Sequence, residues 1–210
     1  MTARRHTLER AFYERPAELV AESLIGKIFS YGPLTGRIVE VEAYDEKEPA
    51  SHGFSGPREG NATLFGPPGH LDVYLVYGVN YLTNVVCQPV GVGAGVLIRA
   101  LEPLAGVEQM RVNRGDTGDP DWRLCSGPGR LSKAFGLSRA DNNTDLVLGK
   151  VRILDDNVVL PYARSARIGV TAAQDLDWRF YVEDNPSVSV LRVPILPTRA
   201  TEPRKAREST

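Results

Sequence analysis

The sequence has few cysteines and histidines and no long hydrophobic run. Its 210 residues include two cysteines, Cys87 and Cys125, and three histidines. Two cysteines in apolar or turn contexts are typical of reduced thiols, and the spacing of the cysteines and histidines does not predict a metal site. No apolar run is long enough to cross a membrane, and no apolar segment of a secretion signal follows the basic start. We therefore expect an intracellular protein, in the cytoplasm or nucleoid if bacterial, with no membrane partner.

A net positive charge is also absent. The chain has 25 Lys and Arg against 26 Asp and Glu, which gives a formal net charge of −1. This balance argues against a strongly basic nucleic-acid binder, although the local field at one face decides binding. Any binding to DNA should be weak, and its affinity should fall steeply as the salt concentration rises. Lysine is scarce and missing from the candidate motifs, which argues against a Schiff-base mechanism.

Length and ordinary hydrophobic content predict one domain, residues 1–198, followed by a polar tail, residues 199–210. Apolar spacing predicts helices at 16–27 and 104–113 and a short helix opened by residues 126–129. Strands are predicted at 36–44, 95–101, 147–154, 166–170 and 179–182. Residues 49–69, rich in Gly, Pro and Ser, form a predicted loop whose length suggests function. The mixture indicates an α+β fold with peripheral helices.

Residues 72–84 (DVYLVYGVNYLTN) are the most informative stretch. Two β-rich runs flank Gly78 and Asn80, which supply turn chemistry for a hairpin. This places Tyr77 at or beside the tip, where its ring would protrude and could wedge between stacked bases. The alternative is that Tyr77 packs on a neighbouring strand, as most strand tyrosines do.

Glu42 and Tyr44 lie two residues apart on one predicted strand, so their side chains share a face. A carboxylate beside an aromatic ring, where a strand leads into a long loop, suits a catalytic base next to a stacking platform. The alternative is a solvated strand edge decorated by Glu40 and Glu42.

Four further positions are candidates for the same chemistry. His52 lies in the long loop, where we expect a hydrogen-bonding anchor before a catalytic residue. Asn84 lies on the second hairpin strand, where an amide needs partners. Arg99 ends a strand, and its alternative role is a surface salt bridge with Glu102. Residues 126–129 (SGPG) place backbone N–H groups at a helix start, which could hold a phosphate or form an ordinary cap.

Taken together, these segments resemble a known family, the alkyladenine (3-methyladenine) DNA glycosylases. The matching motifs run in order from about residue 16 to 190, and they are GRIVEVEAY (36–44), ASH (50–52), FGPPGH (65–70), the hairpin (73–84), VLIRALEP (96–103), LCSGPGRL (124–131) and RFYV (179–182). A chance match of so many ordered motifs is very improbable.

The resemblance implies a single mixed domain with a curved antiparallel sheet, and a monofunctional DNA glycosylase that needs no metal or organic cofactor. Such an enzyme flips alkylated or deaminated purines out of double-stranded DNA and hydrolyses the N-glycosidic bond, leaving an abasic site. We expect a monomer whose partner is duplex DNA containing damaged purines.

The same resemblance implies roles for the matching residues. Glu42 would be the general base that activates water, and Tyr77 the wedge that enters the minor groove. Tyr44 and Tyr74 would stack on the extruded base, with His52 lining the same pocket.

Other matching residues would shape the pocket or contact the DNA. Asn84 would crowd a guanine 2-amino group and so help to reject normal guanine. Arg99, Ser126, Gly127 and Arg130 would support the pocket or contact a phosphate.

Some features depart from the family pattern. The loop from Tyr44 to His52 is one residue shorter than usual and begins with two acidic residues, and residues 56–65 replace an arginine-rich run. Asp72 places a negative charge beside the hairpin, which is unusual near DNA. These changes could narrow or shift the substrate range.

Two other functions stay open. One is a non-catalytic binder of damaged or distorted nucleic acid that retains the fold, which the near-neutral charge and the altered loop keep open. The other is a small-molecule carboxylate hydrolase that uses Glu42, but this would not explain Tyr77 at a hairpin tip.

Overall fold

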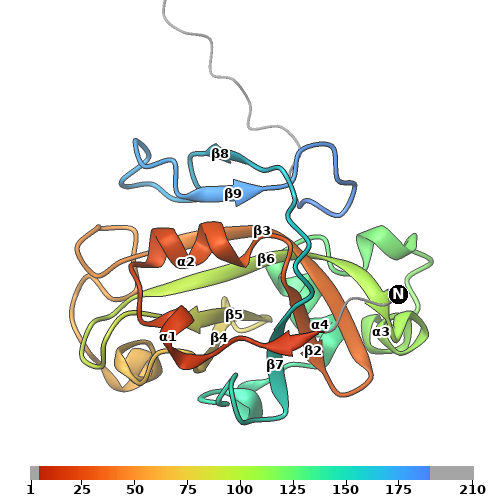
Figure 1. Ribbon diagram of the computed structural model, residues 1–210, viewed down its shortest axis with the longest axis horizontal. Coiled ribbons are helices and arrows are strands. Elements are labelled where there is room, and N and C mark those ends of the chain that lie inside the picture. Colours follow the sequence, from red (N-terminus) through yellow and green to blue (C-terminus); the bar gives the residue numbers. More distant parts are fainter. Residues whose placement is uncertain (1–4, 190–210) are drawn as a thin grey trace, which may run out of the picture.

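The structure, a computed structural model, describes residues 5–189 (Figure 1). Within them, nine strands form one antiparallel sheet in the order β1–β7–β2–β3–β6–β5–β4, with β9 also paired to β3 and β8 paired to β9. The strands are β1 (His6–Thr7), β2 (Ile28–Tyr31), β3 (Leu34–Tyr44), β4 (Leu71–Val76), β5 (Asn80–Val86), β6 (Gly95–Ala105), β7 (Val151–Asp155), β8 (Ala163–Ser165) and β9 (Arg179–Tyr181).

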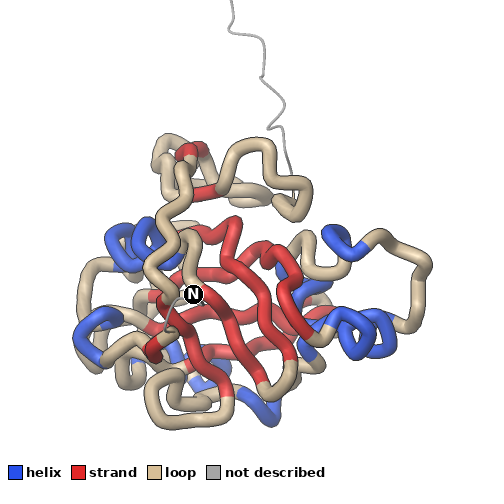
Figure 2. The backbone as a smooth tube through the Cα atoms, turned by 45° about the vertical axis from the view of Figure 1, so that its right-hand side comes forward, coloured by secondary structure: helices blue, strands red, loops and turns tan. Residues whose placement is uncertain are grey.

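Strand β3 links the two parts of the sheet because it changes partner along its length. One edge pairs with β6, whereas the other pairs with β2 through residues 34–37 and with β9 through residues 40–42. The β3–β6 register shifts on both sides of Glu40, where Val39 and Arg99 are passed over in the pairing. Such bulges bend a strand and increase its twist. The sheet accordingly curls, with β8 and β9 lying beyond β3 (Figures 1 and 2).

Helices pack on the outside of the sheet (Figure 2). They are α1 (Arg10–Tyr13), α2 (Ala17–Leu24), α3 (Val107–Arg114) and α4 (Pro128–Phe135), with 3-10 turns η1 (Glu59–Phe65), η2 (Asp121–Arg123) and η3 (Arg139–Asp141). Helix α2 packs against β3 and β6, and α4 against β5 and β6. In α2 the buried stripe is Ala17, Val20, Ala21 and Leu24. Among residues 5–189, no helix is both long and apolar enough to span a membrane.

One row of side chains crosses four neighbouring strands. Asp72 on β4 pairs with Asn84 on β5, Asn84 with Leu97 on β6, and Leu97 with Glu42 on β3. Residues directly opposite each other in antiparallel strands share a face of the sheet. Their chain neighbours, such as Val85, point the other way into the core. Strand pairing therefore collects the polar side chains of Asp72, Asn84 and Glu42 on the face away from the core.

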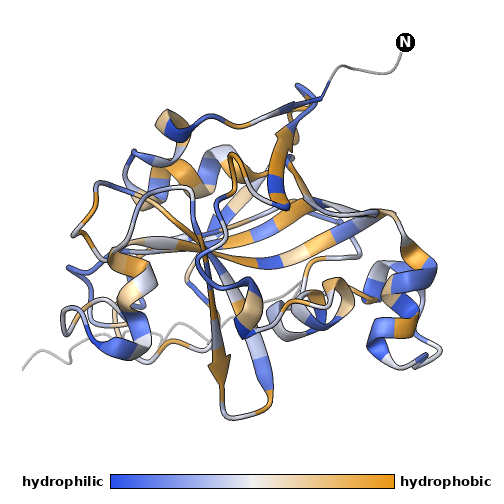
Figure 3. Cartoon of the chain, turned by 90° about the horizontal axis from the view of Figure 1, so that it is seen from below, coloured by the Kyte–Doolittle hydropathy of each residue, from blue (hydrophilic) through white to orange (hydrophobic). Residues whose placement is uncertain are grey.

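The hairpin of β4 and β5 projects beyond the body of the molecule (Figure 3). The predicted α+β fold, with its curved antiparallel sheet, protruding hairpin and peripheral helices, is thus confirmed.

Several predicted elements differ in detail, and the strand predicted at 147–154 begins only at Val151, as β7. Residues 104–105 extend β6, and Gly106 in the left-handed region separates them from α3, which begins at Val107. A strand at 166–170 is wrong, because pairing with β9 ends at Ser165. The loop 49–69 contains the 3-10 turn η1. The predicted domain end at 198 and the tail at 199–210 lie outside the described residues.

Gly69 offers a test of the packing beneath the hairpin. Its φ is +72°, and an added Cβ would lie 2.6 Å from Cδ2 of the fully buried Tyr13. Because both the backbone and the ring oppose a side chain, we expect Gly69→Ala to lower the free energy of unfolding by about 2–4 kcal/mol in urea denaturation. Gly60→Ala is the control, since nothing lies within 4 Å of its added Cβ. Equal stability of the two variants would contradict this packing.

Candidate active site

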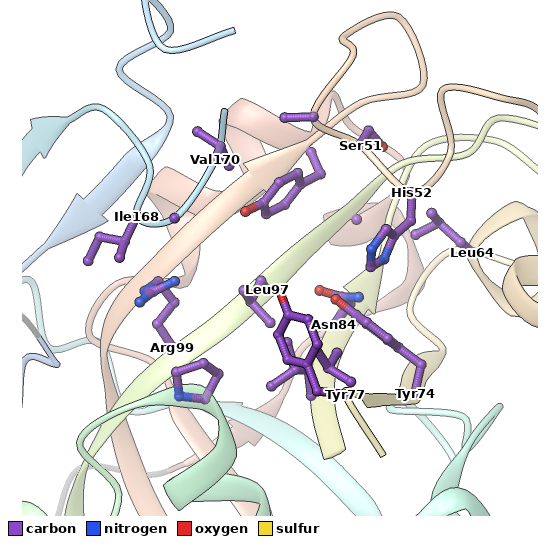
Figure 4. A pocket seen from close by; sticks show the side chains of 17 residues that line it. Ser51, His52, Leu64, Tyr74, Tyr77, Asn84, Leu97, Arg99, Ile168 and Val170 are labelled. Carbon is purple, nitrogen blue, oxygen red and sulfur yellow. The ribbon is translucent and has the colours of Figure 1, made fainter. Parts of the chain in front are cut away.

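A cavity of about 290 Å³ opens on the polar face of the sheet at the base of the hairpin. Figure 4 shows Arg99 and Ile168 on one side of it and His52 and Tyr74 on the other, with Leu97 and Asn84 between them. The lining comes from β3, the loop after it, η1, the hairpin, β6, the start of α4 and the loop at 168–170. Segments far apart in sequence thus meet in one pocket, with aromatic rings around a few polar groups, as is typical of a ligand site.

Glu42 is fully buried, and its three hydrogen-bond partners line the cavity. Its Oε1 accepts a hydrogen bond from the Ile168 N–H at 2.7 Å, and its Oε2 accepts from the Tyr44 hydroxyl at 2.9 Å and Arg99 Nη1 at 3.0 Å. A carboxylate offers about four acceptor sites, so these three donors leave one site on Oε1. The expectation of a solvated strand edge is wrong, because Glu40 is fully buried as well.

Glu40 and Glu42 are joined by Arg99. Arg99 donates through Nε to Glu40 Oε1 at 3.0 Å while its Nη1 reaches Glu42. Glu40 also accepts from Arg179 Nε at 2.8 Å and from the Ser189 N–H at 2.7 Å. Burial would raise the pKa of Glu40, but the two guanidinium groups and the Ser189 N–H hold it below its ordinary value. The alternative pairing of Arg99 with Glu102 is therefore wrong.

Tyr44 is fixed by a cation behind its ring. The Arg167 guanidinium lies 4.5 Å from the ring centroid, a cation–π distance. Arg167 is itself held by both oxygens of Glu48, at 2.5 and 2.9 Å, and by the Ala43 carbonyl at 2.9 Å. Burial and the neighbouring Glu42 raise the pKa of Tyr44. The phenol is therefore a neutral, rigidly held donor that lines the cavity.

Tyr77 stands at the tip of the hairpin with 96% of its surface exposed, so packing on a neighbouring strand is wrong. Tyr77 and Gly78 have φ values of +52° and +69°, and the Val79 N–H donates to the Val76 carbonyl at 3.1 Å. Two positive φ angles are the pattern of a type I′ hairpin turn. Positive φ is uncommon for a tyrosine, and here it presents the ring beside the cavity, which Tyr77 also lines.

His52 and Tyr74 form the side of the cavity opposite Arg99, and Asn84 lies beside Tyr74 towards the middle of the cavity. The rings of His52 and Tyr74 meet edge to face, with centroids 4.9 Å apart. Asn84 Nδ2 donates to Asp72 Oδ2 at 3.1 Å, which supplies the partner that an amide in a strand needs. Burial raises the pKa of Tyr74 to about 12, so its hydroxyl stays protonated.

Residues 126–130 shape the cavity edge from the start of α4. The buried Ser126 hydroxyl donates to the Val188 carbonyl at 3.3 Å, and Arg130 Nη1 donates to the Ser126 carbonyl at 3.0 Å. Gly127, with φ +120°, is the N-cap, and Pro128 lines the cavity. The helix predicted here is confirmed. A phosphate contact by Ser126, Gly127 or Arg130 stays a prediction.

Sequence reasoning missed several groups that complete the site. Arg167 and the Ile168 N–H come from a segment predicted as a strand, and their partners Glu48 and Glu42 lie 119 and 126 residues away. Arg179 belongs to a matched motif (RFYV), which was the one signal that could have pointed to it.

Glu40 offers a test of the buried charge cluster. We expect Glu40→Gln to lower the free energy of unfolding near neutral pH by about 3–5 kcal/mol, because it leaves two buried guanidinium groups undercompensated. Since folding lowers the pKa of Glu40 from 4.5, its stabilisation is present above that value. The difference between wild type and variant should therefore shrink as the pH of the denaturation experiment falls below about 4.5.

The control is Glu18→Gln, which breaks the ion pair between Glu18 and Arg164. The side chains of Glu18 and Arg164 are 37% and 41% exposed. Exposed pairs contribute roughly 0–1 kcal/mol. A loss for Glu40→Gln no larger than for Glu18→Gln would contradict the importance of the cluster.

Comparison with known proteins gives a consistent result. The sequence profile of the family described as "Methylpurine-DNA glycosylase (MPG)" matches residues 11–186. Three relatives, each named "Putative 3-methyladenine DNA glycosylase", come from Burkholderia cenocepacia, Nitrosospira multiformis and Chlorobaculum tepidum. They are 48%, 43% and 41% identical over 187, 170 and 187 residues, which cover 86%, 81% and 85% of this chain and 89%, 87% and 88% of theirs. The matches confirm the predicted resemblance and, with it, the prediction of an enzyme of the DNA glycosylase class.

Proposed function

Because this chain belongs to the methylpurine-DNA glycosylase family, we propose that it excises alkylated or deaminated purines from duplex DNA with a water activated by Glu42. One observation carries the proposal. A buried carboxylate with one open acceptor site lies behind a cavity lined by tyrosines, and a tyrosine at the hairpin tip stands exposed beside the same cavity.

The first step is extrusion of the damaged nucleotide. A base inside a duplex cannot reach the cavity, so it must leave the stack at a cost of a few kcal/mol. Tyr77, already extended in the free protein, would fill the gap that the nucleotide leaves. Tyr44 and Tyr74 would stack on the extruded base, and stacking on aromatic side chains contributes roughly 1–3 kcal/mol per base. A positively charged alkylpurine would gain a further cation–π attraction of roughly 0.5–2 kcal/mol.

The second step is hydrolysis. A water at the remaining acceptor site of Glu42 Oε1 would attack C1′ of the sugar as the C1′–N bond breaks, and its proton would pass to Glu42. A cationic alkylpurine keeps the electron pair of the broken bond and leaves as a neutral base, whereas a neutral purine takes up a proton from solvent. The negative charge of Glu42 would also stabilise the positive charge on the sugar.

The polar contacts of Glu42 suit this role. Arg99, Tyr44 and the Ile168 N–H donate to the carboxylate. Donors alone around a carboxylate suit its ionised form, which is the form that a base requires. Asn84, beneath the base, would oppose a guanine 2-amino group and so favour other purines.

An excision assay separates this function from a non-catalytic binder. Duplex oligonucleotides with a methylated purine, hypoxanthine or 1,N6-ethenoadenine would be incubated with the protein and then treated with alkali. Strand scission at the lesion only after alkali supports monofunctional excision. Binding without scission on any of these substrates would instead favour the binder.

We expect Glu42→Gln to keep its affinity for lesion-containing duplex but to lose excision by roughly 10²–10⁴-fold, because the amide cannot take a proton from water. Single-turnover excision and a fluorescence binding titration measure the two quantities separately. Glu108→Gln is the control, since its side chain is 92% exposed on α3. Excision by Glu42→Gln at the wild-type rate would refute the assignment of the base.

We expect Tyr77→Ala to weaken binding to lesion-containing duplex and to slow excision, each by roughly tenfold or more, because the gap in the stack stays empty. A 2-aminopurine beside the lesion would report extrusion through its fluorescence. Val159→Ala removes a side chain that is 89% exposed in another part of the chain and serves as the control. A fully active Tyr77→Ala variant would exclude the wedge.

A further inference from the structure

Asp72 and Glu42 stand at opposite ends of the same row of side chains. Asn84 and Leu97 lie between them, one on each intervening strand. Neighbouring strands are about 4.8 Å apart, so three strand spacings separate the two backbones by roughly 14 Å. A base seated over Asn84 and Leu97 would therefore have a carboxylate at each end. Glu42 lies on the side proposed for the sugar, and Asp72 on the side of the base.

Asp72 is buried and lacks a full countercharge. It is 6% exposed, and none of the salt bridges among residues 5–189 includes it. Its hydrogen-bond partner is the uncharged Asn84. Burial raises the pKa of Asp72 above its ordinary value, and the bond from Asn84 and the nearby His52 counteract this only in part.

The surroundings of Asp72 connect it to the 290 Å³ cavity proposed to hold the extruded base, which we call the base cavity. Asp72 lines a neighbouring cavity of about 680 Å³, and this cavity shares Ser51, His52, Leu64 and Tyr74 with the base cavity. The charged groups Arg58, Glu59 and Arg139 also line this second cavity, but all three are exposed to solvent. The buried charge nearest to the base on this side is therefore that of Asp72.

We propose that Asp72 makes this enzyme prefer purines that carry positive charge on the ring, such as N3- or N7-alkylated purines, over neutral damaged purines such as hypoxanthine and 1,N6-ethenoadenine. The inference rests on the proposed function. A cationic base would supply the countercharge that Asp72 lacks, in a site where little water screens the attraction. A neutral base of the same shape would leave Asp72 uncompensated.

The negative charge of Asp72 should affect substrate binding more than cleavage of the C1′–N bond. As the C1′–N bond breaks, positive charge leaves the base and develops on the sugar, which lies towards Glu42. Asp72 therefore stabilises the bound substrate more than the transition state. Its removal should weaken binding of cationic lesions while changing the maximal single-turnover rate much less.

The test compares two duplexes, one with the cationic 7-methyladenine and one with hypoxanthine, neither of which carries a 2-amino group for Asn84 to oppose. For Asp72→Asn, we expect the affinity for 7-methyladenine to fall by roughly tenfold relative to the affinity for hypoxanthine, whereas Asp72→Glu retains most of the preference. Glu59→Gln removes an equal charge from the same cavity at an exposed position and should leave the ratio unchanged. An equal change for both lesions in Asp72→Asn would overturn the proposal.

A second measurement uses the wild type, so it does not depend on the folding of a variant. Binding would be compared between 7-methyladenine and 7-methyl-7-deazaadenine, which has nearly the same shape but no ring charge. Equal binding refutes the proposal. Tighter binding of the charged base supports it, and the Asp72→Asn comparison separates the effect of Asp72 from the cation–π attraction of Tyr44 and Tyr74. Failure of the proposed function would appear differently, as the absence of excision from every lesion duplex, because these affinities can be measured without excision.

Discussion

The bridge that Arg99 makes between Glu40 and Glu42 is the interaction on which the rest of the site depends. Two carboxylates without exposed surface could not lie on one strand without cations between them. Arg99 supplies one cation and binds both carboxylates, and Arg179 supplies a second to Glu40. Because Arg99 also lines the cavity, the same side chain that makes the burial of Glu42 possible contributes to the cavity wall beside Glu42.

The geometry of the sheet places this cluster. The register shifts around Glu40 let β3 leave β2 and take β9 as its partner, and β9 brings Arg179 opposite Glu42. The loop before β9 then returns over β3, where Arg167 fixes the Tyr44 ring and the Ile168 N–H binds Glu42. Glu42 is thus held by atoms from two distant segments, which is the preorganisation that its proposed catalytic role requires.

Local sequence rules predicted one half of this arrangement. Alternation placed Glu42 and Tyr44 on one face, and turn chemistry placed Tyr77 at a hairpin tip, because both features depend on neighbours in the chain. The burial of Glu40 and Glu42 could not be predicted in the same way, since Arg99 and Arg179 lie 59 and 139 residues from Glu40. Residues 166–170 have the composition of a strand, but pairing with β9 ends at Ser165 and the Ile168 N–H binds Glu42 instead. Asp72 was visible as an unusual charge, but only strand pairing shows that it shares a row with Glu42.

The late position of β9 in the chain has a consequence for biosynthesis. Strands β2 to β6 leave the ribosome before residues 168–189. Until that segment is synthesised, Glu40 and Glu42 lack three of their hydrogen-bond donors, which are the Ile168 N–H, Arg179 and the Ser189 N–H. A nascent chain of 160 residues would have its hairpin and tyrosines but no complete charge cluster. The central strand can therefore reach its final burial only after residues 168–189 have been synthesised, and the earlier strands cannot complete the charge cluster on their own.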